Sequence, residues 1–168
     1  MSDIDPTPPR PKSPSGEPKP VRPRDELGRP LPRGSQNRLH LADFDAFTLE
    51  ENHRLAVAYF DGGNYFAAHE AWETCWVQAK DTAEQDFFQG LSQLGAGYTH
   101  LRRGNPRGAA ALMRRALVRL APYAPRHRNV DLAALAPAVE AHAEAMAAAA
   151  EAGAPPPAII APAIGGDD

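Results

Sequence analysis

Residues 64–76 read NYFAAHEAWETCW, and this stretch decides the fold because large apolar side chains recur in it at helical spacing. On a helical wheel, one side of the arc carries three aromatic rings: Tyr65, Trp72 and Trp76. Three ionisable side chains, which we call the trio, lie between or beside these rings: His69, Glu70 and Glu73. Burying such groups costs several kcal/mol unless they are paired, so the fold either satisfies the trio internally or uses it.

Helical patterns continue on both sides of this stretch, and no segment alternates with period two for long enough to form a strand. Capping and stop signals predict helices at roughly residues 49–61, 65–80, 82–103, 106–120 and 132–151. Caps are expected at Thr48, with Glu51 completing a capping box, and at Asn64, Thr82 and Asp131. Pro137 is expected to kink the last helix or to force it to restart.

Two of the predicted connections share the dipeptide Gly-Asn, at residues 63–64 and 104–105. Each predicts a helix hairpin in which Gly ends one helix and Asn begins the next. Two hairpins are too few for a solenoid, which usually needs three or more repeats. The sequence therefore predicts an all-α fold, a single compact bundle of about five helices built on two helix hairpins.

Both ends of the 168-residue chain differ from this helical middle. Residues 1–37 are rich in Pro, Arg, Ser and Gly, and residues 152–168 are rich in Ala and Pro. Such segments bury too little apolar surface to offset their ordering entropy, so we expect disordered tails around a domain at residues 38–151.

The composition excludes several classes of protein. The single cysteine, Cys75, rules out an internal disulfide framework and fits a reducing compartment. No secretory signal and no membrane-spanning stretch is visible in the sequence. We therefore expect a cytoplasmic protein that does not enter a membrane.

The third predicted helix supplies candidate partners for the trio. It has no charged side chain from Phe87 to Leu101, so it should lie in the middle of the bundle. One of its faces is apolar, and the other carries three polar side chains: Gln89, Gln93 and His100. We expect these side chains to meet the trio and to form a polar cluster that is the candidate ligand site.

This cluster has three interpretations. The favoured one is a buried hydrogen-bond network that fixes the register of the two helices, because satisfied interior polar clusters are commoner than active sites. The second is a site for a single divalent metal ion held by His69, Glu73 and His100, since imidazole and carboxylate groups bind metals in helix bundles. The third is metal-free acid/base chemistry by His69 with a glutamate, which no nucleophile or phosphate-binding loop supports.

Other residues allow both a functional and a structural interpretation. Tyr65, Trp72 and Trp76 are candidate pocket aromatics, but large rings at helical spacing usually build interiors. Cys75 has no neighbouring Lys or Arg in the sequence to lower its pKa, so an inert core thiol is favoured over a reactive one.

Residues 102–128 contain eight arginines and no acidic residue. Arg114, Arg115 and Arg119 should lie on the solvent side of the fourth predicted helix, where they can bind RNA, DNA or another polyanion. A solvated face paired to the acidic remainder of the chain is favoured, because no recognition motif is present and the formal net charge is −3.

The sequence resembles the bacterial and archaeal domain of unknown function 309 family in several places: FDGGNYFAAHEAWE at residues 60–73, Trp76, FQGLSQL at residues 88–94, His100 and Gly104-Asn105. The resemblance covers about residues 52–121 and implies a small all-helical domain without established biochemistry. The positions that carry the family signature are His69, Glu70, Trp72, Glu73, Trp76, Gln89, Gln93, His100 and Asn105.

These observations favour a non-enzymatic binding or interaction domain, with metal binding and nucleic-acid binding as alternatives. The sequence requires no cofactor and does not decide whether the protein is an enzyme. It does not identify the partner either, which can be another protein or a second copy of this chain.

Overall fold

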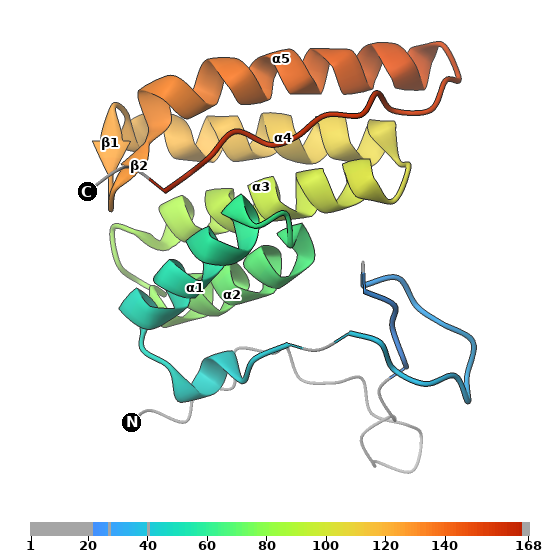
Figure 1. The fold of residues 1–168 in the computed structure, drawn as a ribbon. Coiled ribbons are helices and arrows are strands. Elements are labelled where there is room, and N and C mark those ends of the chain that lie inside the picture. Colours follow the sequence, from blue (N-terminus) through green and yellow to red (C-terminus); the bar gives the residue numbers. More distant parts are fainter. Residues whose placement is uncertain (1–21, 27, 40, 166–168) are drawn as a thin grey trace.

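The computed structural model of the chain describes residues 22–26, 28–39 and 41–165. Five α-helices dominate this part of the chain, which confirms the predicted fold class (Figure 1). Their bounds are α1 Leu49–Asp61, α2 Tyr65–Gln78, α3 Gln85–Arg102, α4 Pro106–Leu120 and α5 Leu132–Glu151. Two short 3-10 helices precede α1 and follow α4, η1 Phe44–Ala46 and η2 Ala121–Tyr123.

A small β-hairpin between α4 and α5 was not predicted. Strands β1 Arg126–His127 and β2 Val130–Asp131 pair antiparallel. The two residues of its turn, Arg128 and Asn129, have φ angles of 43° and 62°, as a two-residue hairpin turn requires. Strands of two residues are too short to show alternation in the sequence.

The predicted start of α1 is confirmed and that of α3 is shifted. Thr48 and Glu51 form the capping box of α1. At α3, the Thr82 hydroxyl instead donates to the carbonyl oxygen of Ala79 at 2.6 Å and closes a turn. The helix therefore begins three residues later than Thr82, at Gln85.

Both Gly-Asn connections have the predicted form. Gly63 and Gly104 have φ angles of 83° and 76°, which glycine adopts without strain. Asn64 and Asn105 then cap α2 and α4, each accepting from a backbone N–H three residues further on.

Asp131 caps α5 as predicted, but Pro137 does not interrupt this helix. The Asp131 carboxylate accepts from the backbone N–H of Ala134 at 3.0 Å. Pro137 lies in the second turn, and α5 continues through it to Glu151 without a restart. A proline at this position removes a single backbone hydrogen bond, which the packed helix tolerates.

The helices pack in chain order, each against the next, with α3 in the middle as predicted. Figure 1 shows α4 and α5 on one side of α3 and α1 and α2 on the other. The largest fully buried side chains come from all five helices and form one core: Phe60, Trp72, Phe87, Phe88, Leu91, Leu94, Tyr98, Met113, Val139 and Met146. Of the described helices, none has the length and apolar character needed to cross a bilayer.

The described part of the segment after α5, residues 152–165, has no helix and is held against the bundle. It returns beside the helices to the hairpin (Figure 1). Ile164 is only 3% exposed, and the N–H groups of Ile164 and Gly165 donate to the Asp61 carboxylate at 2.7 and 2.9 Å. The apolar side chain of Ile164 explains why this segment packs. Residues 166–168 lie outside the described residues.

Most of the predicted N-terminal tail, residues 1–21, also lies outside the described residues. The described residues 22–26 and 28–39 form a turn in which Asp25 pairs with Arg29 at 2.7 Å. Gly28 fits tightly against α2, because a Cβ atom there would lie 2.7 Å from the Phe66 ring. This segment therefore contacts the bundle near the trio.

Candidate functional site

The trio lies on α2, and His69 lies against α3 at their closest approach. A Cβ atom on Gly95 of α3 would lie 3.0 Å from both the Cα and the backbone N of His69. No side chain other than hydrogen fits between these two backbones without a shift. The position of His69 is therefore set by α3 as well as by α2.

The imidazole of His69 is oriented by the backbone of α3. Its Nδ1 lies 2.8 Å from the carbonyl oxygen of Ser92 and 3.0 Å from the Ser92 hydroxyl. A carbonyl oxygen only accepts, so Nδ1 carries a proton and donates to it. The Ser92 hydroxyl in turn donates to the His69 carbonyl oxygen at 3.3 Å. Nε2 is therefore the ring nitrogen whose lone pair can accept a hydrogen bond or bind a metal ion.

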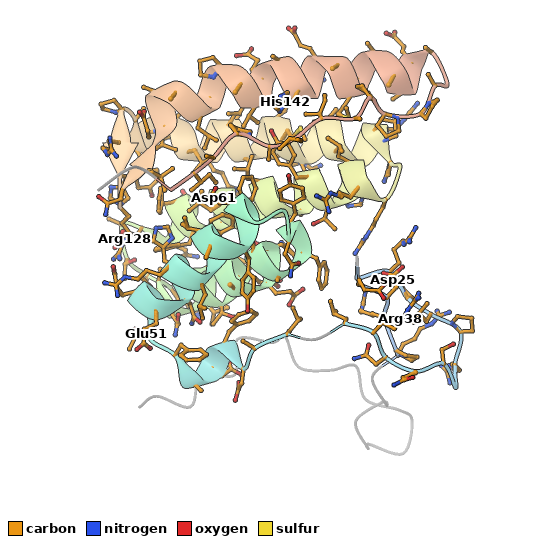
Figure 2. The ribbon with its side chains drawn as sticks, in the orientation of Figure 1. Asp25, Arg38, Glu51, Asp61, Arg128 and His142 are labelled. Carbon is orange, nitrogen blue, oxygen red and sulfur yellow. The ribbon has the colours of Figure 1, made fainter. Side chains whose placement is uncertain are left out.

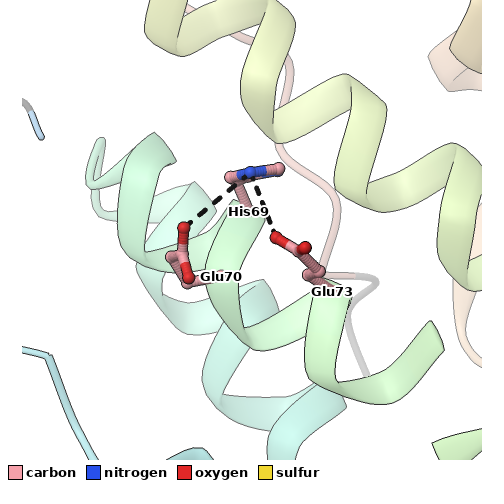
Figure 3. A group of neighbouring side chains, drawn as sticks. All are labelled: His69, Glu70 and Glu73. Atoms are coloured by element: carbon pink, nitrogen blue, oxygen red, sulfur yellow. Dashed lines mark ion pairs between the residues drawn. The ribbon is translucent and has the colours of Figure 1, made fainter. Parts of the chain in front are cut away.

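Nε2 of His69 faces both carboxylates of the trio (Figure 3). It lies 3.9 Å from Glu70 Oε1 and 3.5 Å from Glu73 Oε2, and these side chains are 24–35% exposed. The three atoms fall within 4.8 Å of one another. A nitrogen lone pair and two carboxylates repel one another at this spacing, so the arrangement needs a positive charge. A proton on Nε2, a proton on one of the carboxyls or a metal cation supplies it.

The surroundings of Glu70 strengthen this requirement. Burial, the largest influence, raises the pKa of Glu70; the charge on His69 lowers it, and the Glu73 carboxylate raises it. The charge of Arg24 also lowers this pKa, but the net effect is an increase, so the ionised form of this carboxyl is less favoured than in water.

The glutamines predicted to complete the trio do not do so. Among the described residues, no hydrogen bond joins Gln89 or Gln93 to a side chain of the trio. Gln93 Oε1 is buried and has no hydrogen-bond partner in the described part of the chain. The side chain that α3 contributes is Ser92, which the sequence did not single out because a serine on an uncharged helix carries no signal of its own.

His100 lies near the trio but outside the group of three convergent ligand atoms. Its Nδ1 accepts from Asn105 Nδ2 at 3.0 Å. Burial lowers the pKa of His100, and the charges of Arg103 and His69 lower it further. Glu70 instead joins the group, in the place that the metal-site hypothesis gave to His100.

Of the three candidate pocket aromatics, the structure places Tyr65 beside a hollow. Tyr65 lines a space of about 260 Å³ with Phe66 and Arg102 among its other walls. Trp72 is fully buried in the core. Trp76 is partly buried, and its Nε1 has no hydrogen-bond partner among residues 22–26, 28–39 and 41–165. Cys75 is buried, and burial raises the pKa of its thiol, in agreement with an inert core residue.

The arginines of residues 102–128 do not form one surface. Arg102 and Arg103 lie over the rings of Tyr65 and Phe66. Arg128 lies instead at the hairpin, where it pairs with Glu50 and Glu84. The three arginines predicted to face solvent line one groove of α4: Arg114, Arg115 and Arg119.

A second polar network, centred on His53 of α1, was missed. His53 is 5% exposed, yet its Nδ1 accepts from Trp72 Nε1 at 3.1 Å and its Nε2 donates to the carbonyl oxygen of Arg128 at 3.2 Å. Burial lowers the pKa of His53, in agreement with a neutral ring. Both nitrogens are occupied, so His53 joins α1, α2 and the hairpin. A lone histidine on the apolar face of the first predicted helix was the signal available.

Arg128 extends this network to the surface at the hairpin (Figure 2). Its guanidinium contacts Glu84 at 2.8 Å and Glu50 at 2.8 Å. His127 Nε2 lies 2.9 Å from the same Glu84 carboxylate. Hydrogen bonds, first from Arg128 and then from His127, lower the pKa of Glu84 to about 2.

Glu84 should therefore make stability depend on pH in the acid range. Its folded pKa lies below the unfolded value of about 4.3, so its contribution is complete above pH 4.3 and is lost as pH falls towards 2. Urea unfolding measures the free energy of unfolding at pH 5 and at pH 2. After allowance for solvent screening, we expect the decrease between these pH values to be about 1 kcal/mol smaller in Glu84→Gln than in the wild type. Glu140→Gln, an exposed change on α5, is the control and should follow the wild type. Equal pH profiles for both variants would contradict the assignment.

A family model described as "Domain of unknown function (DUF309)" matches residues 53–112, which confirms the family resemblance. The matched region runs from His53 in α1 into α4 and contains the whole trio. The searches of curated proteins and of solved structures found no match.

Proposed function

We propose that this chain, whose residues 53–112 match the DUF309 family, binds a single divalent metal ion through His69, Glu70 and Glu73. The proposal describes a helical metal-binding domain and assigns no reaction to it. One observation carries it: the carbonyl oxygen of Ser92 accepts a hydrogen bond from the Nδ1–H of His69, which leaves the unprotonated Nε2 facing two carboxylates.

This arrangement has the features of metal-binding histidines. Such a histidine usually donates its second ring N–H to a carbonyl or carboxylate, which fixes the tautomer and the ring orientation. His69 does so at 2.8 Å, and the close contact with Gly95 fixes the backbone from which the ring projects. The ring orientation is thus fixed by the protein in the absence of a metal ion.

The spacing of the trio suits one ion after a small adjustment. Ligand atoms about 2.1 Å from a metal lie roughly 3.0–3.5 Å apart in octahedral or tetrahedral geometry. The distance of 3.5 Å from Nε2 to Glu73 lies at the upper end of this range and that of 3.9 Å to Glu70 exceeds it slightly. Rotation of the partly exposed glutamate side chains can close the difference. One imidazole and two carboxylates suit Zn²⁺, Mn²⁺ or Fe²⁺ and leave positions for water or a ligand.

The rival account is a structural ion pair. If Nε2 is protonated, His69 is an imidazolium that pairs with Glu73 and helps to hold α2 in place. The two accounts differ in what the carboxylates do in the metal-free protein. They repel the Nε2 lone pair in a metal site and stabilise the fold in an ion pair.

Glu73→Gln distinguishes these accounts because it keeps the shape of the side chain and removes its charge. We expect Zn²⁺ affinity, measured by calorimetric titration of the metal-depleted full chain, to fall by about tenfold or more. The stability of the metal-free variant should stay within about 0.5 kcal/mol of the wild type, since a partly exposed pair contributes little and a repulsion is removed. Saturation of the wild type at 100 times Kd should add about 2.7 kcal/mol to its free energy of unfolding.

Glu140→Gln makes the same change at an exposed position of α5 and should leave Zn²⁺ affinity unchanged. A wild-type chain that binds no Zn²⁺ would contradict the proposal. So would a Glu73→Gln variant that loses stability while its Zn²⁺ affinity equals that of the wild type.

A further inference from the structure

A groove on α4 lies apart from the trio and from the His53 network. It encloses about 540 Å³, and its lining includes Asp86 of α3, Pro122 and four side chains of α4: Arg114, Arg115, Val118 and Arg119. Because positions three and four apart share a helix face, Val118 lies one turn beyond Arg114 and Arg115 on the same side of α4. The groove thus combines positive charge with an apolar centre.

The charge of the groove is only partly neutralised. Arg119 pairs with Asp86 at 2.9 Å. Within the described part of the chain, Arg114 and Arg115 have no acidic partner. Both side chains are exposed, and two unpaired guanidinium groups flank one side of the groove.

Val118 is the second feature that a ligand would use. It is 75% exposed, whereas Met113 and Leu120 of the same helix are buried in the core. A single exposed valine needs no explanation, but this one lies on the lining of a groove between charged side chains. A ligand with carboxylates and an apolar side chain would complement both features.

We propose that this groove binds an acidic peptide segment of a partner protein, with carboxylates on Arg114 and Arg115 and an apolar side chain on Val118. Charge complementarity selects the partner, because guanidinium groups form forked, charge-assisted hydrogen bonds with carboxylates. The site is independent of the metal proposal, since it shares no residue with the trio.

A peptide fits this groove better than a nucleic acid does. The three arginines span six residues of helix, about 8 Å, which is too short to follow more than one or two phosphates. Asp86 neutralises Arg119, so only two arginines are left for phosphate contacts. Among the described residues, no aromatic side chain lines the groove for base stacking. Val118 has no counterpart on a sugar-phosphate backbone, whereas an apolar peptide side chain can cover it.

The test uses the full chain and three labelled probes. The first is a short peptide with Glu and Leu at helical spacing, the second is the same peptide with Leu replaced by Ser, and the third is single-stranded oligouridylate. Binding is measured by fluorescence anisotropy at low salt. The variants are R114E/R115E, Val118→Ser, and R107E/R126E as a control with the same change in charge at exposed positions outside the groove.

We expect the Glu-Leu peptide to bind, and its affinity to fall at least about tenfold in R114E/R115E, which is the loss of roughly 1.4 kcal/mol. The control should stay within about twofold of the wild type, and Val118→Ser should weaken the Glu-Leu peptide more than the Glu-Ser peptide. No binding of the Glu-Leu peptide would overturn the proposal. An equal loss of peptide affinity in R114E/R115E and in R107E/R126E would also overturn it. So would binding of the oligouridylate that is tighter than that of the Glu-Leu peptide and depends on Arg114.

Discussion

Replacement of Gly95 with valine should destabilise the domain by about 3 kcal/mol and abolish the Zn²⁺ binding that we propose for the trio. The new Cβ would lie 3.0 Å from the Cα and backbone N of His69, and these backbone atoms cannot move without shifting α2 against α3. Any such shift also carries His69 away from the Ser92 carbonyl oxygen that orients its ring. Urea unfolding and calorimetric Zn²⁺ titration measure the two effects.

Ala96→Val is the matched control, because it adds a β-branched side chain one residue further along α3 at a partly exposed position. It should cost less than about 1 kcal/mol, in the range of helix propensity, and preserve Zn²⁺ binding. Equal stability of the two variants would show that α2 and α3 do not depend on their close approach at Gly95.

Trp72→Ala should be the most destabilising core substitution on α2, with a cost of about 3–5 kcal/mol. Trp72 is fully buried, and its ring packs against Phe60 with centroids 5.7 Å apart. The change also leaves His53 Nδ1 without its donor. Trp72→Phe keeps part of the ring and should cost about 1–3 kcal/mol, from the unpaired His53 Nδ1 together with the smaller ring. Thermal and urea unfolding of both variants provide the comparison.

Trp76→Ala provides the control on the same helix. Trp76 is partly exposed and its Nε1 has no hydrogen-bond partner among the described residues, so truncation should cost clearly less than at Trp72. If Trp72→Phe were as stable as the wild type, the hydrogen bond to His53 would not contribute to the fold.

The boundaries of the helices were predictable because they depend on local chemistry. The capping box at Thr48 and the Gly-Asn pairs act within three or four residues of themselves, and the structure shows each of them in its expected role. Thr82 was misleading because its hydroxyl can close a turn as well as cap a helix, and the choice depends on the loop between α2 and α3.

The trio was predictable as an unusual group, but its partners were not. Helical spacing shows that His69 and Glu73 are neighbours, whereas the register between α2 and α3 decides what lies opposite them. Gly95 and Ser92 set that register, and backbone contacts of this kind leave little trace in residue type. Gln89, Gln93 and His100 were therefore expected to meet the trio, while a backbone carbonyl on α3 orients its histidine.

The hairpin network could not be inferred from the sequence because its members are distant in the chain. Glu50, Glu84 and Arg128 come from three separate segments and meet only after the helices pack. Eight arginines in residues 102–128 suggested a basic surface, yet packing distributes them over both ends of the bundle and one groove.

The protonation state of His69 in the presence of Zn²⁺ tests the metal site most directly. Long-range ¹H–¹⁵N NMR of the metal-depleted full chain at neutral pH reports both ring nitrogens of each histidine. We predict that Nδ1 of His69 carries a proton throughout, and that one equivalent of Zn²⁺ shifts the Nε2 signal to that of a metal-bound nitrogen. A Nε2 that carries a proton before and after Zn²⁺ addition would contradict the metal site and identify the trio as a structural ion pair.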